Sequence, residues 1–311
     1  MKAVAIKAYG DINNLHEIEL GVPELAEDEV LVENYATSVN PIDWKARLGY
    51  LKEAYSWEFP VILGWDTAGV ITQVGAKVTN FKIGDKVFAR PDIYADGKRG
   101  TYAQYVAVKE DKLALKPDEI TFEEAAAVPL AGLTALQVVV DRLHVKKGDK
   151  VLIQGGAGGV GLFAIQIAKH LGAYVAATAS KKNHEFLKSL GADEVIDYHE
   201  AKIGTVLSNY DAVFDTVNAI DDGLAILKEN GRLVTIAGKP SVEQKASSKE
   251  VSGWRMQPNG KQLKELGDWI VAGEVKVVID SVYPLTTAGL RAAHKKSQSG
   301  HARGKLVIKV K

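Results

Sequence analysis

Cysteine is absent from the 311-residue sequence, and its absence limits the chemistry that the protein can perform. Without cysteine the chain forms no disulfide, carries no thiolate nucleophile and builds no cysteine-ligated zinc site. Any oxidation or reduction that the protein catalyses therefore needs a bound organic cofactor.

The sequence also lacks an excess of either charge and any long apolar run. Lysine and arginine together number 39, as do aspartate and glutamate, so no net field attracts nucleic acid or an anionic membrane surface. No apolar run approaches the roughly 20 residues that span a bilayer. The opening residues lack an apolar signal core and an arginine-rich presequence. We therefore expect a cytoplasmic protein that binds neither nucleic acid nor a membrane.

Two patterns of hydrophobic residues divide the chain. Residues 1 to about 121 alternate short apolar runs with glycine-rich turns, which is the period-two pattern of an antiparallel barrel or sandwich. Residues 122–272 instead alternate short buried runs, such as 151–154, with helix-period segments, such as 221–230, and this predicts a doubly wound parallel sheet. Residues 273–311 return to strand character around one amphipathic helix. We predict an α/β protein in which this tail rejoins the first domain.

Local signals mark the domain boundary and one loop. Thr121 followed by an acidic turn predicts a helix start, and Pro129 should interrupt or kink the helical stretch that follows. The most polar segment, residues 239–253, is the best candidate for a mobile loop.

The sharpest motif is a glycine-rich turn between an apolar strand and an amphipathic helix. Gly156, Gly158 and Gly161 form G-x-G-x-x-G, with Gly159 and Val160 between the last two. In a dinucleotide-binding fold, the first glycine permits the tight turn, the second lets a pyrophosphate approach, and the third lets helix and sheet pack closely. The alternative is a flexible turn, which the flanking strand and helix disfavour.

The end of the next predicted strand indicates which dinucleotide binds. NAD-binding folds place an acidic residue there for the ribose 2′-hydroxyl, whereas this chain has Ser180, Lys181 and Lys182. A hydroxyl and two cations suit a 2′-phosphate, and therefore favour NADPH. Tyr198 either adds a phenolic donor to the same phosphate or caps the sheet edge. The alternative for the lysines is a solvated pair that opens a helix.

Several motifs in order resemble the zinc-free quinone oxidoreductase branch of the medium-chain dehydrogenase/reductase superfamily. They are GGAGGVG, VGAKVTNFKIGDKVFA, ILGWDTAG, VPLAGLTAL and the closing RGKLVIKV, and NPIDWKARLGY is similar to NADPH-dependent alkenal/enone and quinone reductases. The resemblance implies a GroES-like β-barrel domain over 1–121 and 273–311 and a Rossmann NADP-binding domain over 122–272. It also implies a cleft for nicotinamide and substrate between the two domains, and a homodimer.

The chain departs from the metal-using members of that superfamily at both motifs that carry their zinc ligands. The cysteine motif reads from Ser38 to Asp43 here, and the glycine-His-Glu motif reads Gly64, Trp65, Asp66. The seven histidines are scattered without any short-range ligand spacing. We therefore predict no metal site.

The resemblance assigns candidate residues on the substrate side. It places Asn40 beside the substrate carbonyl as a hydrogen-bond donor, although Asn40-Pro41 would also suit a simple turn. Tyr50, as a proton donor, and Tyr55 belong to a segment that resembles the substrate wall, where either is alternatively only lining. Trp65 contacts substrate in this interpretation, and a core aromatic is the alternative.

Further residues are assigned to the cofactor by the same resemblance. Thr134 resembles a cofactor contact, or else bonds its own helix backbone. Val217, Ile236 and Gly238 follow strands that should line the nicotinamide side, and Arg303 returns from the C-terminal segment.

These residues predict a zinc-independent oxidoreductase that transfers hydride from NADPH to a small electrophile, either a quinone or an α,β-unsaturated carbonyl. The alternatives are an NADPH-binding structural or redox-sensing protein without turnover, and a zinc-free alcohol dehydrogenase-like enzyme of another substrate class. Loops over 45–60, 90–100 and 239–256 should set the substrate, which the sequence does not identify.

Overall fold

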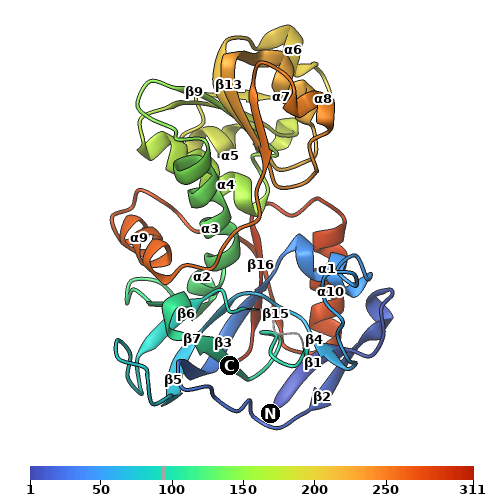
Figure 1. Cartoon of the computed structure of the whole chain (residues 1–311), viewed down its shortest axis with the longest axis vertical. Helices are drawn as coiled ribbons and strands as arrows, with labels where there is room; N and C mark the ends of the chain where they lie inside the picture. Colours follow the sequence, from blue (N-terminus) through green and yellow to red (C-terminus); the bar gives the residue numbers. More distant parts are fainter. Residues whose placement is uncertain (93–95) are drawn as a thin grey trace. The chain divides into compact units, whose positions relative to one another are not determined.

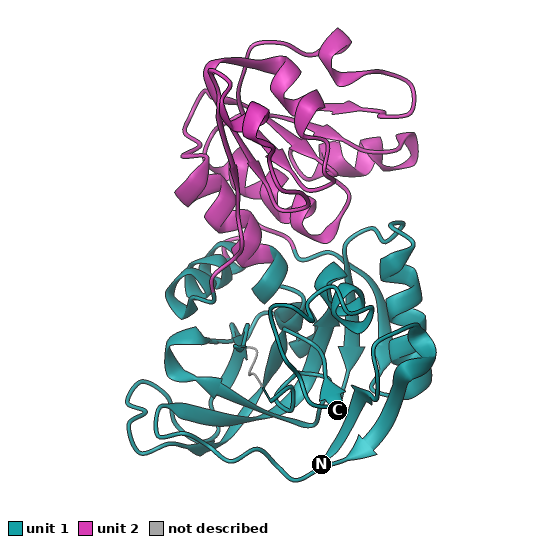
Figure 2. Cartoon of the chain, turned by 45° about the vertical axis from the view of Figure 1, so that its right-hand side comes forward, with its two compact units in different colours: residues 1–131, 258–271, 277–311 teal, residues 132–257, 272–276 magenta. Residues whose placement is uncertain are grey.

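The computed structural model describes residues 1–92 and 96–311, so the expected pocket loop over 90–100 lies partly outside the described residues. The chain divides into two compact units (Figure 2). Unit 1 comprises Met1–Ala131, Pro258–Val271 and Val277–Lys311, and unit 2 comprises Gly132–Gln257 and Ala272–Lys276. The chain therefore leaves unit 1 after Ala131, returns with Pro258–Val271, adds Ala272–Lys276 to unit 2 and ends in unit 1. The predicted α/β fold class is confirmed.

Unit 1 is built mainly on antiparallel strands, as its period-two pattern predicts. Its strands are β1 (Lys2–Ile6), β2 (Leu15–Glu19), β3 (Glu29–Val39), β4 (Val61–Ile62), β5 (Thr67–Val74), β6 (Lys86–Ala89), β7 (Tyr105–Lys109), β8 (Leu113–Leu115), β15 (Ile279–Pro284) and β16 (Lys305–Lys309). The larger sheet has the order β15-β16-β3-β5-β6-β8, with β7 also paired to β3, and the smaller sheet has the order β2-β1-β4 (Figure 1). Strand β16 runs antiparallel to β3 with Leu306 opposite Val39, so the C-terminal strand belongs to this sheet.

The helices of unit 1 begin where the sequence provides caps. They are α1 (Pro41–Arg47), α2 (Phe122–Ala126), α9 (Gly260–Val271) and α10 (Thr287–Gln298), with 3₁₀ turns at Ile12–Asn14 and Glu110–Lys112. The predicted cap is confirmed, because the Thr121 hydroxyl accepts the Glu124 amide at 3.1 Å. The predicted interruption is also confirmed, because Pro129 starts a new helix, α3 (Pro129–Leu136), which continues as a π-helical turn at Gln137–Arg142.

Unit 2 is a six-stranded sheet in which every pairing is parallel. Its elements are β9 (Lys150–Gln154), α4 (Gly159–His170), β10 (Tyr174–Thr178), a 3₁₀ turn (Lys181–Asn183), α5 (His184–Ser189), β11 (Glu194–Ile196), α6 (Ile203–Val206), β12 (Tyr210–Asp215), α7 (Ile220–Ile226), β13 (Leu227–Thr235), α8 (Val242–Lys245) and β14 (Glu250–Gly253). The strand order is β11-β10-β9-β12-β13-β14. The order therefore reverses between β9 and β12, which is where ligands bind in open parallel sheets.

Helix α1 interrupts the strands of residues 1–121, because Pro41 and the Asp43 carboxylate favour a helix start. Two local expectations were wrong. Helix α7 ends at Ile226, earlier than the pattern over 221–230 predicts, because Leu227 pairs with Tyr210 in the sheet. The expected loop over 239–253 instead contains α8 and the edge strand β14, since backbone pairing with β13 outweighs its polar composition.

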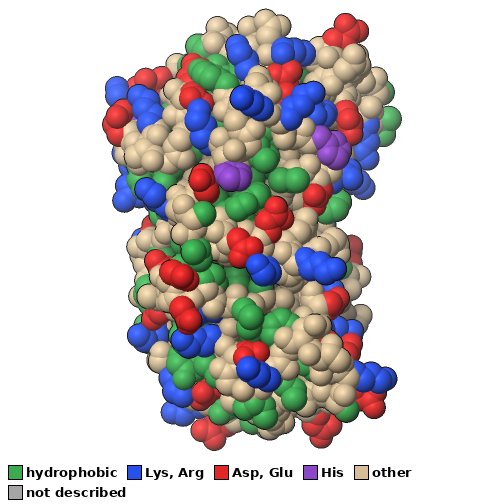
Figure 3. Space-filling model, turned by 90° about the vertical axis from the view of Figure 1, so that its left-hand side faces the viewer, with side chains coloured by type: hydrophobic (Ala, Val, Ile, Leu, Met, Phe, Trp, Pro, Cys, Tyr) green, Lys and Arg blue, Asp and Glu red, His purple; other side chains and the backbone are tan. Residues whose placement is uncertain are grey.

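Each unit has its own apolar core. In unit 1, Ile6, Trp65 and Leu306 pack in one buried cluster, and in unit 2 Leu152 and Val213 centre another. Basic and acidic side chains are interspersed on the face that Figure 3 displays, in keeping with the balanced composition. Within the described part of the chain, no helix is long and apolar enough to cross a bilayer.

Candidate functional site

The glycine-rich turn is fixed by close contacts at some glycines and open at another. Gly155, which precedes the G-x-G-x-x-G residues, has a φ of +79°, so the left-handed conformation of the tight turn falls there and not at Gly156. Gly156 is needed for packing instead, because a Cβ there would lie 2.9 Å from Ala177 Cβ. A Cβ on Gly161 would lie 2.3 Å from the Gly155 carbonyl oxygen, so this position tolerates no side chain. A Cβ on Gly158 would meet only that same oxygen, at 3.5 Å. The space beside Gly158 is therefore open to a bound group.

Helix α4 starts directly behind this open space. Gly158 is its N-cap residue and has no side chain to cap the helix. The first backbone N–H groups, at Gly159, Val160 and Gly161, have no acceptor within the helix and lie at the positive end of its dipole. This arrangement fits a pyrophosphate, because its negative oxygens take the place of the missing cap.

The ends of β12 and β13 reach the same edge of the sheet. The buried Asp215 carboxylate accepts the Val217 amide at 3.0 Å and the Thr235 hydroxyl at 2.6 Å, which ties the two strand ends together. A Cβ on Gly155 would lie 2.7 Å from Val217 Cγ1, so the glycine turn adjoins them. Gly238 contacts the Asn218 side chain closely, and Ile236 lies between Thr235 and Gly238 on this edge. The structure therefore brings Val217, Ile236 and Gly238 together with the turn.

The predicted 2′-phosphate residues surround a carboxylate, Asp197, that is not among the residues predicted from the sequence. Asp197 accepts the backbone N–H of Lys181 at 3.0 Å and that of His199 at 2.9 Å. These bonds hold the pKa of Asp197 below its usual range, because backbone N–H groups that donate to the carboxylate stabilise its charged form. The Lys181 ammonium faces the exposed Glu200 at 3.8 Å, and exposed pairs of this kind are weak. The signal for Asp197 was its place directly after β11, next to β10.

Ser180 and Tyr198 lie at the same corner of unit 2. The Ser180 hydroxyl accepts the Asn183 amide at 3.2 Å, and Tyr198 is 56% exposed with its ring against His199. Two other predicted cofactor residues are placed elsewhere: Thr134 is buried in α3 of unit 2, and Arg303 is exposed before β16 in unit 1.

Unit 1 contains a cluster of buried polar side chains around Asn40. The Asn40 side-chain amide donates to Asp66 Oδ2 at 2.7 Å, and its oxygen accepts a hydrogen bond from the Lys305 ammonium. The Ser38 hydroxyl donates to the same Asp66 oxygen, and the Leu130 amide donates to the other at 2.7 Å. Asn40, Asp66 and Lys305 are 2%, 0% and 3% exposed. Although Asn40 is the N-cap residue of α1, its side chain makes no cap bond and turns to this cluster instead.

A chain of buried hydrogen bonds continues from Asn40. The Asp43 carboxylate accepts the Asn40 backbone N–H at 2.7 Å and the Tyr102 hydroxyl at 2.5 Å. Tyr102 is also 3.2 Å from His294 Nε2, and Arg47 donates to His294 Nδ1 at 3.3 Å. Because the guanidinium only donates, Nδ1 accepts and the neutral imidazole carries its proton on Nε2.

Burial controls the charges along this chain. Burial raises the pKa of Asp43 to about 7, although the Tyr102 and Asn40 hydrogen bonds oppose the shift. Burial lowers the pKa of His294 to about 3, and the Arg47 charge acts in the same direction. His294 is completely buried, so it is not a surface residue.

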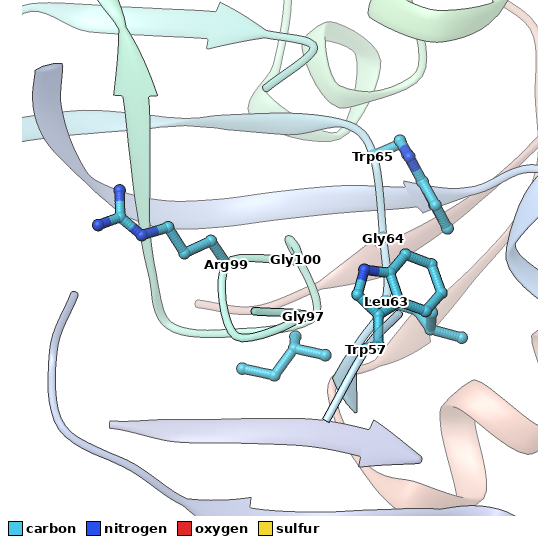
Figure 4. Close-up of a pocket in the computed structure, with 8 residues that line it drawn as sticks. Trp57, Leu63, Gly64, Trp65, Gly97, Arg99 and Gly100 are labelled. Atoms are coloured by element: carbon cyan, nitrogen blue, oxygen red, sulfur yellow. The ribbon is translucent and has the colours of Figure 1, made fainter. Parts of the chain in front are cut away.

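The remaining substrate-side residues do not enter the Asn40 cluster. Tyr50 is 69% exposed after α1, and Tyr55 stacks on Trp57 with ring centroids 5.0 Å apart. Trp65 is a core side chain, and its indole N–H has no hydrogen-bond partner among the residues described. Figure 4 shows the small cavity beside Trp57 and Trp65, with the Arg99 guanidinium pointing away from both rings. Its volume of about 10 Å³ admits one water molecule at most, not a substrate.

Within the described ranges, no group of three or more His, Asp or Glu side chains could hold a metal ion. No local pattern marks Tyr102 or His294 as part of this cluster, whereas Lys305 carries one signal: a single charge at the start of the apolar run KLVI.

Two family profiles and several known proteins match the chain. Residues 26–118 match the alcohol dehydrogenase GroES-like domain, and residues 190–308 match the zinc-binding dehydrogenase family. The chloroplastic NADPH-dependent alkenal/one oxidoreductase of Arabidopsis thaliana is 38% identical over 99% of this chain and 79% of its own length. The quinone oxidoreductase structure from Coxiella burnetii is 36% identical, with a TM-score of 0.89 over 100% of this chain and 99% of its own. The Escherichia coli quinone oxidoreductase complexed with NADPH is 26% identical, with a TM-score of 0.86 over 100% of both chains.

Proposed function

Because the chain belongs to the medium-chain dehydrogenase/reductase superfamily, in the branch of the quinone and alkenal/one oxidoreductases, we propose that it reduces a quinone or an α,β-unsaturated carbonyl with NADPH, without a catalytic metal. The proposal that no catalytic metal takes part rests on the Asn40 amide, which is held as a hydrogen-bond donor in a buried cluster. That cluster lies at the motifs where the zinc-using members carry ligands.

The residues of unit 2 fit NADPH. The open space at Gly158 and the first N–H groups of α4 receive the pyrophosphate. Ser180, Lys181 and Tyr198 bind the 2′-phosphate, while Val217, Ile236 and Gly238 line the nicotinamide side. Thr134, buried in α3, and Arg303, exposed before β16, stay predicted cofactor contacts. When bound, NADPH supplies the hydride.

Asn40 stabilises the negative charge that develops on the acceptor oxygen. Its amide nitrogen has two N–H groups, and one donates to Asp66, so the other is the donor for the substrate. A quinone or enone spreads the developing charge over a conjugated system, whereas an ordinary ketone concentrates it on one alkoxide that a Lewis acid would have to stabilise. A single amide donor therefore selects conjugated acceptors.

The final proton comes from solvent or from the Tyr50 hydroxyl. Tyr50 is 69% exposed, so its hydroxyl can recover a proton from water. Tyr55, which stacks on Trp57, and Trp65, which packs in the apolar core of unit 1, form the wall behind the substrate. This wall gives the site shape without adding a further charge.

The test is NADPH oxidation, followed at 340 nm, with a panel of quinones, enones and saturated ketones. Asn40→Ala should lower kcat by roughly 10²- to 10³-fold, as loss of one oxyanion donor does, while the Kd for NADPH stays unchanged. Asn80→Ala, at an exposed asparagine, is the matched control and should behave as wild type. Chelators should not affect the rate.

Three results would contradict the proposal. Tight NADPH binding without oxidation by any acceptor would indicate a structural or redox-sensing protein. Better turnover with saturated alcohols would indicate an alcohol dehydrogenase-like enzyme. Activity that chelation abolishes and zinc restores would refute the metal-free site.

We further propose a homodimer in which the edge strand β14 of unit 2 pairs with its copy, since an edge strand presents unpaired backbone N–H and C=O groups that a second copy can bond. Light scattering should then give twice the chain mass of 33.6 kDa.

A cytoplasmic location remains a prediction, which cell fractionation tests.

A further inference from the structure

Lys305 is a buried cation whose surroundings consist of oxygen atoms. Its ammonium donates to Asn40 Oδ1, and it lies 3.5 Å from the Val39 carbonyl oxygen and 3.6 Å from Asp66 Oδ2. An ammonium has three N–H donors and no acceptor, so three neighbouring oxygens match its charged form. Burial lowers the pKa of Lys305, and the Asp66 and Asp43 carboxylates oppose that shift.

Strand pairing brings these distant residues together. Because Leu306 pairs with Val39, Lys305 at the start of β16 lies beside Asn40 at the end of β3. Asp66 directly precedes β5, which pairs with β3 on its other side. The three side chains therefore meet at one end of the barrel strands, 265 residues apart in the chain in the case of Asn40 and Lys305.

The donor set at this point does not fit zinc. The zinc-binding dehydrogenase match implies a metal, but an amide and an ammonium replace the thiolate or imidazole ligands that Zn²⁺ requires. A fixed positive charge beside Asp66 also repels a divalent cation. We propose that the Lys305 ammonium takes the place of the metal as the fixed cation of this site, and that it is a positioning residue that holds Asn40 with its amide nitrogen as the donor.

The orientation of the Asn40 amide follows from its two charged partners. A carboxylate only accepts hydrogen bonds and an ammonium only donates them. A flipped amide would place its oxygen 2.7 Å from Asp66 and its N–H groups against Lys305, so both contacts would become repulsive. The Asn40 amide nitrogen is therefore always available to donate. This inference rests on the proposed function only for the step in which that nitrogen donates to the substrate oxygen.

The test uses Lys305→Met, Asp66→Asn and the double variant, with Lys309→Met as the matched control. Lys309 is on the same strand but is exposed, and it pairs with Glu123 at the surface. Each single variant leaves a buried charge without its partner, and should lower the Tm by roughly 5–10 °C. The double variant removes both charges, so we expect it to regain most of that loss.

Activity separates positioning from packing. The double variant should keep the wild-type Kd for NADPH but lose kcat by roughly 10- to 100-fold, because the amide is no longer held in one orientation. KM should change much less than kcat. Recovery of both Tm and kcat in the double variant would overturn the proposal, since Lys305 would then serve stability alone. A loss of the same size in Lys309→Met would also overturn it.

A second measurement does not depend on turnover. The two Asn40 side-chain N–H protons, identified by their absence in Asn40→Ala, should have well separated NMR shifts in wild type because only one donates to Asp66. They should converge in the double variant, and unchanged shifts would refute the orienting role. If wild type oxidises no NADPH, the proposed function fails while this measurement still decides the orientation.

Discussion

Replacing Asp43 with Asn should change how stability depends on pH, and the sign follows from two buried groups. Burial raises the pKa of Asp43 from 3.8 to about 7, against the Tyr102 and Asn40 hydrogen bonds, with Asp66 and Lys305 also facing it. Burial lowers the pKa of His294 from 6.5 to about 3, with Arg47 acting in the same direction. The two groups are joined through Tyr102.

The two groups act on stability in opposite directions. From pH 3.8 to about 7 the folded protein keeps a proton on Asp43 that the unfolded chain releases, so this group makes stability fall as the pH rises. From about 3 to 6.5 the unfolded chain holds a proton on His294 that the folded protein lacks, so this group makes stability rise with pH. In the window that they share, the wild-type contributions cancel.

Asp43→Asn removes the Asp43 contribution, so only His294 then makes stability change with pH over this window. One proton over the 2.5 pH units from pH 4 to pH 6.5 corresponds to roughly 3–4 kcal/mol, at about 1.4 kcal/mol per unit. The free energy of unfolding of the variant should therefore rise by about that amount, relative to wild type, between pH 4 and pH 6.5.

The assay is urea unfolding at several pH values, followed by tryptophan fluorescence, since Trp44, Trp57 and Trp65 all lie in unit 1. Asp222→Asn, at an exposed carboxylate, is the control and should run parallel to wild type. If Asp43→Asn also runs parallel to wild type across this range, the buried-proton argument is refuted.

Three further predictions concern single positions. Gly161→Ala should destabilise unit 2 and abolish NADPH binding, because its Cβ would lie 2.3 Å from a carbonyl oxygen. Gly158→Ala should lower only the affinity for NADPH, because a Cβ there meets one atom at 3.5 Å. Thermal melts and NADPH titrations of both variants separate the two effects. Ser180→Asp should erase most of the preference for NADPH over NADH, expected at roughly 10² from two charge-assisted bonds, and equal Kd values in wild type would contradict this. Thr121→Ala should cost about 1 kcal/mol in denaturant unfolding, the usual value of a lost N-cap, and no change would show that the cap is dispensable.

Local signals predicted the elements that local physics controls. The Thr121 cap and the Pro129 break depend on residues within one or two helical turns, and the glycine-rich turn depends on contacts among neighbours such as Gly155 and Gly161. Predictions were wrong where pairing with a distant strand overrode the local pattern, as at Leu227, which joined β13 instead of extending α7.

By itself, the sequence determined which side chains were present to do chemistry: no cysteine, no clustered histidines, a glycine-rich turn between a strand and a helix, and Asn40 in a motif that resembles the cysteine motif of the zinc-using members. Only the tertiary structure decided what surrounds Asn40. Lys305 looks like an ordinary charged residue at the start of a strand until β16 pairs with β3 and buries its ammonium beside Asn40 and Asp66. The reason is physical, because charge, orientation and pKa depend on burial and on partners that lie hundreds of residues away, and no local pattern encodes either.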